Sequence, residues 1–264
     1  MKVEVVVCTK NRPEKLAACV PRFKQQIPFD TFTVYEGSEH PSKQVIEGLE
    51  QAHDVNFRYV PDKLFGAVRH DAIANSTADY ICMVDDDIYL CDGWFERLMP
   101  GFSDPNVVAV SSHLIYTGPS VVQKIFEGNT RTSGGSGGAS IYDRRKVLAV
   151  GNFDSGIHRG EDMELELRIH AAGKKWVKNP AVTAKHPIDS IHSLLMRPYA
   201  NVVGWNFIMQ YSKHKWLFMA QRFGSLLIMP VYYALRTHDL RAGAVWFLYK
   251  WRALYSFLRG KYQR

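Results

Sequence analysis

The alternation of short apolar runs with helix-like segments in the first 111 residues constrains the fold more than any other feature. Runs rich in β-branched residues are typical of buried strands. Strands joined by helical crossovers pair in parallel, and helices cover both faces of their sheet. The sequence therefore predicts an α/β fold with a mostly parallel central sheet. We expect strands at residues 3–8, 31–35, 56–60, 80–84 and 107–111, and helices at 14–25, 42–52, 67–76 and 93–99.

Polar residues follow three of these strands at the point where each strand ends. Residues 9–12 follow the first strand, residues 36–38 the second and residues 85–87 the fourth. Ligands of such sheets bind beyond the carboxyl ends of the strands. The sequence therefore predicts a binding site at this rim, built from three separate strand ends.

Three consecutive aspartates, Asp85, Asp86 and Asp87, form the most acidic part of this rim. We call them the aspartate triplet. Adjacent like charges at the end of a buried strand are expensive unless a cation neutralises them. Carboxylates favour Mg²⁺ or Mn²⁺, which commonly bridge to substrate phosphates. A solvated turn would also use aspartate, so the triplet alone leaves both interpretations open. The chain has no GxxxxGK[ST] or GxGxxG after its first strand, which argues against a P-loop nucleotidase or a dinucleotide enzyme.

Six motifs follow one another along the chain: VVVCTKNRP, YEGS, FGAVRHDAIANSTADYICMVDDD, GGASIYDRRKVLAVGNFD, GEDMELELRIHAAGK and AVTAKH. Each is weak alone, but their order and spacing resemble the inverting GT-A glycosyltransferases of family 2. The resemblance covers roughly residues 1–187. It implies a GT-A catalytic domain over residues 1–187, with residues 188–264 as a helical appendage.

The resemblance assigns a metal site and a donor site to the rim. The triplet matches the family's DXD motif, which implies that Asp87 contacts Mn²⁺ or Mg²⁺, helped by Asp85 and by the late His186. The resemblance also implies that Asp85 lies near the donor's ribose and that Arg69 either contacts phosphate or holds the acidic cluster. The remaining residues implied to bind the nucleotide donor are Asp86, Thr9, Asn11, Arg12 and Glu36.

The nucleobase pocket departs from the family's pattern. The usual DDGS reads Tyr35-Glu36-Gly37-Ser38 in this chain. A UDP-sugar is the expected donor because it is the family default, while GDP- and dTDP-sugars stay open.

The resemblance further implies that Asp162 is the catalytic base and that Glu161 either supports it or contacts the acceptor. Inversion needs one displacement, in which a base removes the proton of the attacking acceptor hydroxyl. The alternative is that the two carboxylates only stabilise the N-terminus of a helix that ends near Gly173. The glycine-rich residues 134–138 are predicted to form a mobile loop beside the site.

Cysteine usage and the N-terminus bear on the compartment. The four cysteines show no CxxC spacing, so we expect free thiols in a reducing compartment. The start, MKVEVVVCTK, does not match a signal peptide, because its apolar run is short and carries Glu4. These features predict a cytoplasmic protein.

The last 80 residues differ in composition from the rest of the chain. Residues 185–264 hold 12 Lys and Arg against 2 Asp and Glu, and 16 of the 33 aromatic residues. The uncharged run at residues 223–235 contains Pro230 and is shorter than the roughly 20 residues of a membrane span. Interleaved basic and aromatic residues predict helices that lie in a membrane interface, with a packed appendage or an oligomer interface as the alternative. We do not expect nucleic acid binding, because no reading module is visible.

Together these features predict a glycosyltransferase at the inner face of the cell membrane. It would move a sugar from a nucleotide donor to a hydroxyl of a lipid-linked glycan. A polyprenyl-phosphate glycosyltransferase, which makes the lipid-linked sugar itself, is one alternative. A non-catalytic module that binds the membrane surface is the other.

Overall fold

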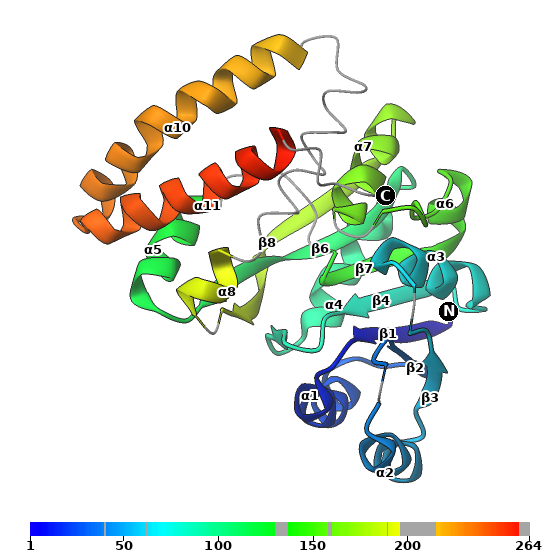
Figure 1. Cartoon of the computed structure of the whole chain (residues 1–264). Coiled ribbons are helices and arrows are strands. Elements are labelled where there is room, and N and C mark those ends of the chain that lie inside the picture. The colour runs from blue at the N-terminus through cyan, green and yellow to red at the C-terminus, as the bar shows by residue number, and fades with distance from the viewer. Residues whose placement is uncertain are drawn as a thin grey trace. The chain divides into compact units, whose positions relative to one another are not determined.

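The computed structural model describes residues 1–39, 41–61, 63–129, 137–157, 160–188, 190–195 and 215–258 (Figure 1). The chain divides into two compact units. The first comprises Met1–Leu114 and Ser133–His186, and the second comprises Ile115–Thr132 and Pro187–Arg264. The predicted domains, 1–187 and 188–264, were continuous in sequence. The structure instead groups residues 115–132 with the C-terminal part.

The first unit contains the parallel sheet that the sequence predicted. Its strands lie in the order β3-β2-β1-β4, and every neighbouring pair is parallel. They are β1 (Val3–Thr9), β2 (Thr31–Glu36), β3 (Asn56–Tyr59) and β4 (Tyr80–Val84), joined by helices α1 (Pro13–Gln26), α2 (Lys43–His53) and α3 (Phe65–Asn75). Pro13 begins α1, where its missing N–H is not needed.

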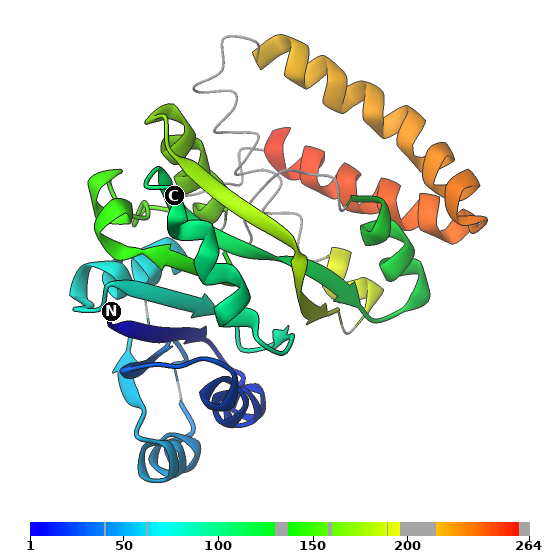
Figure 2. The same ribbon diagram turned by 180° about the vertical axis from the view of Figure 1, so that it is seen from behind.

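Beyond β4 the sheet continues in antiparallel pairs, which the sequence analysis did not predict. Strand β7 (Ala139–Asp143) is antiparallel to β4, and β6 (Val107–Thr117) is antiparallel to β7. Strand β8 (Lys175–Pro187) follows, and β5 (Tyr89–Leu90) is antiparallel to it. Figure 2 shows these strands from behind. Strand β6 is six residues longer than the predicted strand at residues 107–111, and its last residues belong to the second unit.

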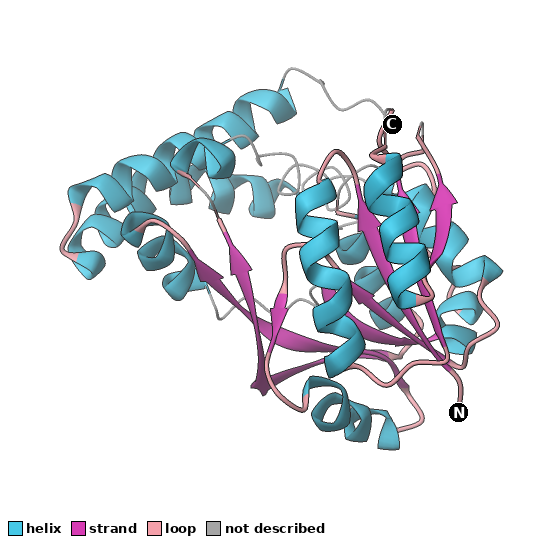
Figure 3. Cartoon of the chain, turned by 90° about the horizontal axis from the view of Figure 1, so that it is seen from below, coloured by secondary structure: helices cyan, strands magenta, loops and turns pink. Residues whose placement is uncertain are grey.

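Both faces of the sheet are buried in the first unit, and alternate residues of β1 show it. Val5 and Val7 belong to a cluster with Phe23 of α1, whereas Val6 belongs to a second cluster with Ile73 of α3. Side chains of a strand alternate between its faces, so a run of valines serves both. The helices can be followed in Figure 3, and the remaining ones of this unit are α4 (Trp94–Leu98), the 3₁₀ helix η1 (Met99–Ser103), α6 (Arg144–Ala149) and α7 (Glu161–Ala171).

The second unit is helical over its described residues, apart from the ends of β6 and β8. Its helices are α5 (Ser120–Asn129), α8 (Ile191–Leu195), α10 (Lys215–Thr237) and α11 (Leu240–Leu258). Helices α10 and α11 lie side by side and are joined by a two-residue turn (Figures 1 and 2). We call them the α10–α11 hairpin.

Two close contacts lie between the helices of this hairpin. Tyr233 stacks on Trp246 with 5.6 Å between ring centroids. A Cβ atom at Gly243 would collide with the backbone carbonyl of Pro230, so glycine is needed for this close approach. Within the described residues, neither helix is apolar over a stretch long enough to cross a bilayer.

Candidate active site

The aspartate triplet lies directly after β4, and two of its three carboxylates are buried. Asp86 and Asp87 are 4% and 5% exposed. Thr9 Oγ1 donates a hydrogen bond to Asp86 Oδ2 at 2.7 Å, and Arg12 Nη1 donates to Asp86 Oδ1 at 2.9 Å. Asp86 therefore ties the end of β4 to the end of β1. This contact brings together three of the predicted donor-binding residues.

Asp87 is surrounded by cationic groups. Arg12 Nη1 lies 3.0 Å from Asp87 Oδ2, and Lys15 Nζ lies 3.5 Å from the same oxygen. The other oxygen, Oδ1, faces His186 Nε2 at 3.3 Å. Burial acts to raise the pKa of Asp87, but the hydrogen bond and charge of His186, with Arg12 and Lys15, lower it well below its ordinary value. Asp87 is therefore held as an anion.

The Asp87–His186 pair has a geometry that suits a shared divalent ion. Neighbouring ligands of an octahedral ion, each about 2.1 Å from it, lie about 3 Å apart. The 3.3 Å between Asp87 Oδ1 and His186 Nε2 is close to that separation. Among the described residues, no three His, Cys, Asp or Glu side chains are grouped so as to hold a metal by themselves.

Arg69 is a buried cation between two acidic groups. Its side chain is 4% exposed, its Nη2 lies 3.3 Å from Asp85 Oδ1, and its Nη1 lies 3.2 Å from Glu161 Oε1. The guanidinium also lies 4.6 Å from the centre of the Phe65 ring and 5.8 Å from that of Phe153. Burial acts to lower the pKa of Arg69, but Glu161 and Asp85 outweigh it and raise the pKa. Of the two predicted roles, these contacts favour holding the acidic cluster.

Glu161 and Asp162 open α7 but have different surroundings. Glu161 is buried, and burial raises its pKa to about 7, with Arg69 opposing the rise and Asp162 adding to it. Asp162 is only half-buried. Its Oδ2 accepts a hydrogen bond from the Gly137 N–H at 3.1 Å, and its Oδ1 accepts one from the Met163 N–H at 2.8 Å. Asp162 is therefore the more accessible carboxylate, held in one orientation by two backbone donors.

Two consecutive glycines connect the triplet with the start of α7. A Cβ atom at Gly137 would collide with Arg69 Nη1 and lie 2.8 Å from the Cβ of Asp162. A Cβ atom at Gly138 would collide with the carboxylate of Asp85. No side chain fits at either position without moving a site residue. The sequence predicted a mobile loop beside the site at residues 134–138, and residues 134–136 of it lie outside the described residues.

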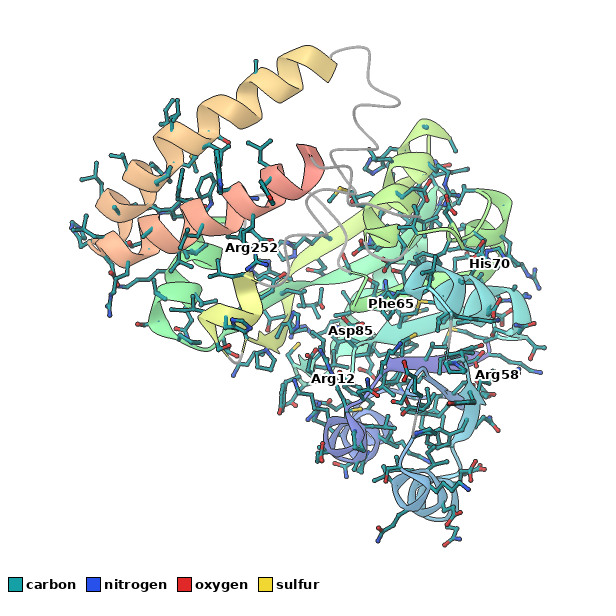
Figure 4. The ribbon with its side chains drawn as sticks, in the orientation of Figure 1. Arg12, Arg58, Phe65, His70, Asp85 and Arg252 are labelled. Carbon is teal, nitrogen blue, oxygen red and sulfur yellow. The ribbon has the colours of Figure 1, made fainter. Side chains whose placement is uncertain are left out.

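The segment before α7 is fastened to α3. Asn152 has a positive φ of 59° and donates from Nδ2 to the His70 carbonyl at 3.0 Å. His70 Nδ1 lies 2.8 Å from the Phe153 carbonyl, and Arg168 Nη2 donates to the Asn152 carbonyl at 2.5 Å. His70 and Phe65 are both labelled on α3 in Figure 4. These contacts fix residues 152 and 153 against α3 and α7.

The ends of β1 and β2 are joined by hydrogen bonds at the predicted nucleotide pocket. The Ser38 N–H and Oγ both donate to Glu36 Oε1, the former at 2.8 Å. Ser38 Oγ in turn accepts from the Asn11 N–H at 2.6 Å, and Asn11 has a positive φ of 57°. The Gly37 N–H donates to the Thr9 carbonyl at 2.9 Å. The buried Glu36 therefore holds its own loop.

The structure brings the predicted site residues together within the first unit, and their donor, metal and catalytic roles stay predictions. Sequence reasoning missed Lys15 as a partner of Asp87, and it missed the anchoring role of Asn152 and Arg168. Lys15 follows Arg12 by about one helical turn, a spacing that could have indicated it. No sequence signal indicated Asn152 or Arg168.

Comparison with known proteins identifies a family over the first half of the chain. The family model described as "Glycosyl transferase family 2" matches residues 4–148, which include the triplet but not Glu161, Asp162 or His186. The pre-mycofactocin glycosyltransferase of Mycobacterium tuberculosis (strain H37Rv) is 26% identical over an alignment of 203 residues, and the match covers 70% of this chain and 42% of that protein. The succinoglycan biosynthesis protein ExoM of Rhizobium meliloti (strain 1021) is 24% identical over an alignment of 213 residues, and the match covers 71% of this chain and 67% of that protein. The chain thus spans less than half the length of the first relative.

Solved structures confirm the fold. The mannosyltransferase PcManGT from Pyrobaculum calidifontis, in complex with GDP-Man and Mn²⁺, has a TM-score of 0.75 at 16% identity. It covers 99% of this chain, and the match covers 88% of its own. GalNAc-T7 with UDP, GalNAc and Mn²⁺ has a TM-score of 0.59 at 11% identity, over 72% of this chain and 44% of its own. The predicted GT-A fold is therefore confirmed.

Proposed function

The chain belongs to glycosyl transferase family 2, and on this premise we propose that it is a metal-dependent inverting glycosyltransferase. It moves a sugar from a nucleoside-diphosphate donor to a hydroxyl group. One observation carries the proposal. Arg69 contacts both Asp85 of the triplet and Glu161 beside the candidate base, so the two halves of the site share one buried cation.

The donor half of the site is suited to a diphosphate. Asp87 and His186 would hold Mn²⁺ or Mg²⁺, with Asp85 nearby, and both solved neighbours are titled as complexes with Mn²⁺. When bound, the ion would offset the charge of the diphosphate and stabilise the leaving nucleoside diphosphate. Arg12 is half exposed beside the triplet and can contact a donor phosphate while keeping its pairs with Asp86 and Asp87.

The acceptor half supplies the base. Asp162 removes the proton from the acceptor hydroxyl as that oxygen attacks the anomeric carbon, and the proton ends on the Asp162 carboxylate. The Gly137 and Met163 N–H groups orient the carboxylate for this transfer. Glu161 stays buried against Arg69 and positions the start of α7, because it is too enclosed to meet an acceptor. One displacement inverts the anomeric configuration.

The donor and acceptor are proposed at class level. A UDP-sugar is the expected donor. One structural neighbour is a complex with GDP-Man and the other a complex with UDP, so both uridine and guanosine donors are included in the proposal. We propose a lipid-linked glycan as the acceptor, at the inner face of the cell membrane. A relative named for succinoglycan biosynthesis supports a role in making polysaccharide or glycolipid.

Transfer assays on the purified chain test this function. The protein is incubated with Mn²⁺ or Mg²⁺ and a panel of UDP-, GDP- and dTDP-sugars, and sugar transfer and donor hydrolysis are both measured. We expect Asp162→Asn to lower kcat by about 10²- to 10⁴-fold while donor affinity stays within about twofold. Asp104→Asn makes the same chemical change at a half-buried residue paired with Lys175, and it should not change kcat.

Two results would contradict the proposal. Wild-type protein that neither transfers nor hydrolyses any donor would remove the enzyme assignment. A fully active Asp162→Asn variant would favour the polyprenyl-phosphate alternative, because an ionised phosphate acceptor needs no base.

A further inference from the structure

Exposed apolar side chains concentrate on the α10–α11 hairpin. Sixteen large apolar side chains of the described residues are exposed, and ten of them lie on these two helices. Single exposed apolar residues are normal, but a concentration of this kind marks an interaction surface. We call the ten residues the outer apolar face: Leu227, Ile228, Val231, Tyr232, Leu235, Leu240, Phe247, Leu248, Trp251 and Tyr255.

On α10 the exposed residues form a stripe opposite the packed side. Residues 227, 228, 231, 232 and 235 fall within an arc of about 140° at 3.6 residues per turn. Leu227 is 77% exposed and Leu235 70%. Leu226 and Tyr233, which are buried, lie on the other side of the helix. Helix α10 is therefore apolar on two faces, and only one of them is packed within the unit.

Helix α11 repeats this arrangement with aromatic residues. Leu240, Phe247, Trp251 and Tyr255 share one side, and the rings of Phe247 and Trp251 stack with 6.0 Å between centroids. The buried residues Ala242 and Trp246 lie on the opposite side. Trp and Tyr side chains favour the boundary between water and lipid, because they combine a large apolar surface with a polar group.

The charged residues that border the outer apolar face are basic. On α11, Arg241 and Arg252 lie on one side of the stripe and Lys250 on the other. Arg236 borders the α10 stripe, and Arg252 is labelled in Figure 4. The one acidic residue of α10, α11 and their turn is Asp239, and its carboxylate is paired with Arg241 and Lys124. The border of the face is therefore positively charged.

We propose that the outer apolar face of the hairpin inserts into the interface of an anionic lipid bilayer, with both helices lying in the membrane plane. An apolar stripe edged by basic residues is the pattern of such helices, and neither helix is suited to span. A second copy of the hairpin is a poorer occupant, because it would bring like basic borders together. Membrane binding by the hairpin deepens the proposed function, since the enzyme must reach a lipid-anchored acceptor at the membrane. The residues that support it all belong to the second unit.

Vesicle flotation of the full chain tests the surface. Vesicles of equal parts phosphatidylcholine and phosphatidylglycerol are compared with pure phosphatidylcholine. We expect wild-type protein to float with the anionic vesicles and the Leu227→Gln, Leu240→Gln double variant to bind at least about tenfold less, because two apolar side chains leave the lipid contact. Leu148→Gln, the same change at an exposed leucine of α6, should bind within about twofold of wild type. Thermal melts by circular dichroism confirm that each variant is folded.

The outcomes separate the proposal from its rivals. Wild-type protein that fails to float, or a double variant that floats as well as wild type, overturns it. Equal binding to anionic and neutral vesicles overturns the role of the basic border. If wild-type protein sediments as a dimer without lipid, and the double variant sediments as a monomer but floats as well as wild type, the outer apolar face binds a second copy of the chain. Donor hydrolysis is measured on the same preparations. Wild-type protein that floats but does not hydrolyse any donor would count against the proposed function and would not contradict the membrane-binding surface.

Discussion

Replacing Arg69 with methionine is expected to destabilise the first unit in a way that depends on pH. The variant keeps a long apolar side chain beside Phe65 and removes the cation between Asp85 and Glu161. Breaking a buried ion pair costs about 3–5 kcal/mol, because the remaining charge is left without a partner. A third of the Asp85 side chain is exposed, so water screens its share of the loss. We therefore expect a loss of about 4 kcal/mol at pH 8.

The cost should shrink at low pH because of Glu161. Its pKa in the folded protein is raised from its ordinary value of 4.5 to about 7, mainly by burial. The folded protein therefore holds a proton that the unfolded chain has lost between these two values, and wild-type stability falls as pH rises through that window. At pH 5 Glu161 is already neutral, so removing Arg69 costs less there than at pH 8. Each unit by which a pKa changes corresponds to about 1.4 kcal/mol.

Urea unfolding at pH 5 and pH 8, followed by circular dichroism, measures both effects. Arg58→Met is the matched control, because Arg58 is an exposed arginine on β3 (Figure 4). Adding Glu161→Gln to the Arg69→Met variant should remove most of the pH dependence, since the buried group no longer titrates. A loss below about 1 kcal/mol at pH 8, or an equal loss at both pH values, would refute the reasoning.

Three further substitutions test close contacts of the structure. Gly138→Ala places a Cβ against the Asp85 carboxylate, so it should weaken the binding of a nucleoside diphosphate with Mn²⁺ by about tenfold, as measured by calorimetry. Gly48→Ala is the control and should not change this affinity, because open space surrounds Gly48. His186→Ala removes the partner of Asp87 Oδ1 and should raise the Mn²⁺ concentration for half-maximal activity by about tenfold or more; an unchanged metal titration would count against ligation. Gly243→Ala forces α11 away from the Pro230 carbonyl, so it should lower the free energy of opening of the hairpin, measured by amide hydrogen exchange, by about 1–3 kcal/mol. Gly224→Ala is the control and should leave this free energy unchanged or raise it.

The local sequence determined the parallel half of the sheet and the location of the rim. Alternating strands and helices fix their own backbone by short-range patterns, and the polar residues that follow β1, β2 and β4 meet because parallel strands end at one edge. The order of motifs also indicated the family, which the match over residues 4–148 shows. No local pattern predicted the antiparallel continuation through β7 and β6, because strand direction depends on long-range pairing.

Only the tertiary structure decided how the site is held together. Arg69 lies 16 residues before Asp85 in the chain and 92 before Glu161, so no local spacing could show that one guanidinium serves both. The same holds for Gly137 and Gly138, whose missing side chains matter only because Arg69, Asp162 and Asp85 crowd against them. Burial and charge pairing are properties of the packed chain. They separate the enclosed Glu161 from the accessible Asp162, although the two residues are neighbours in sequence.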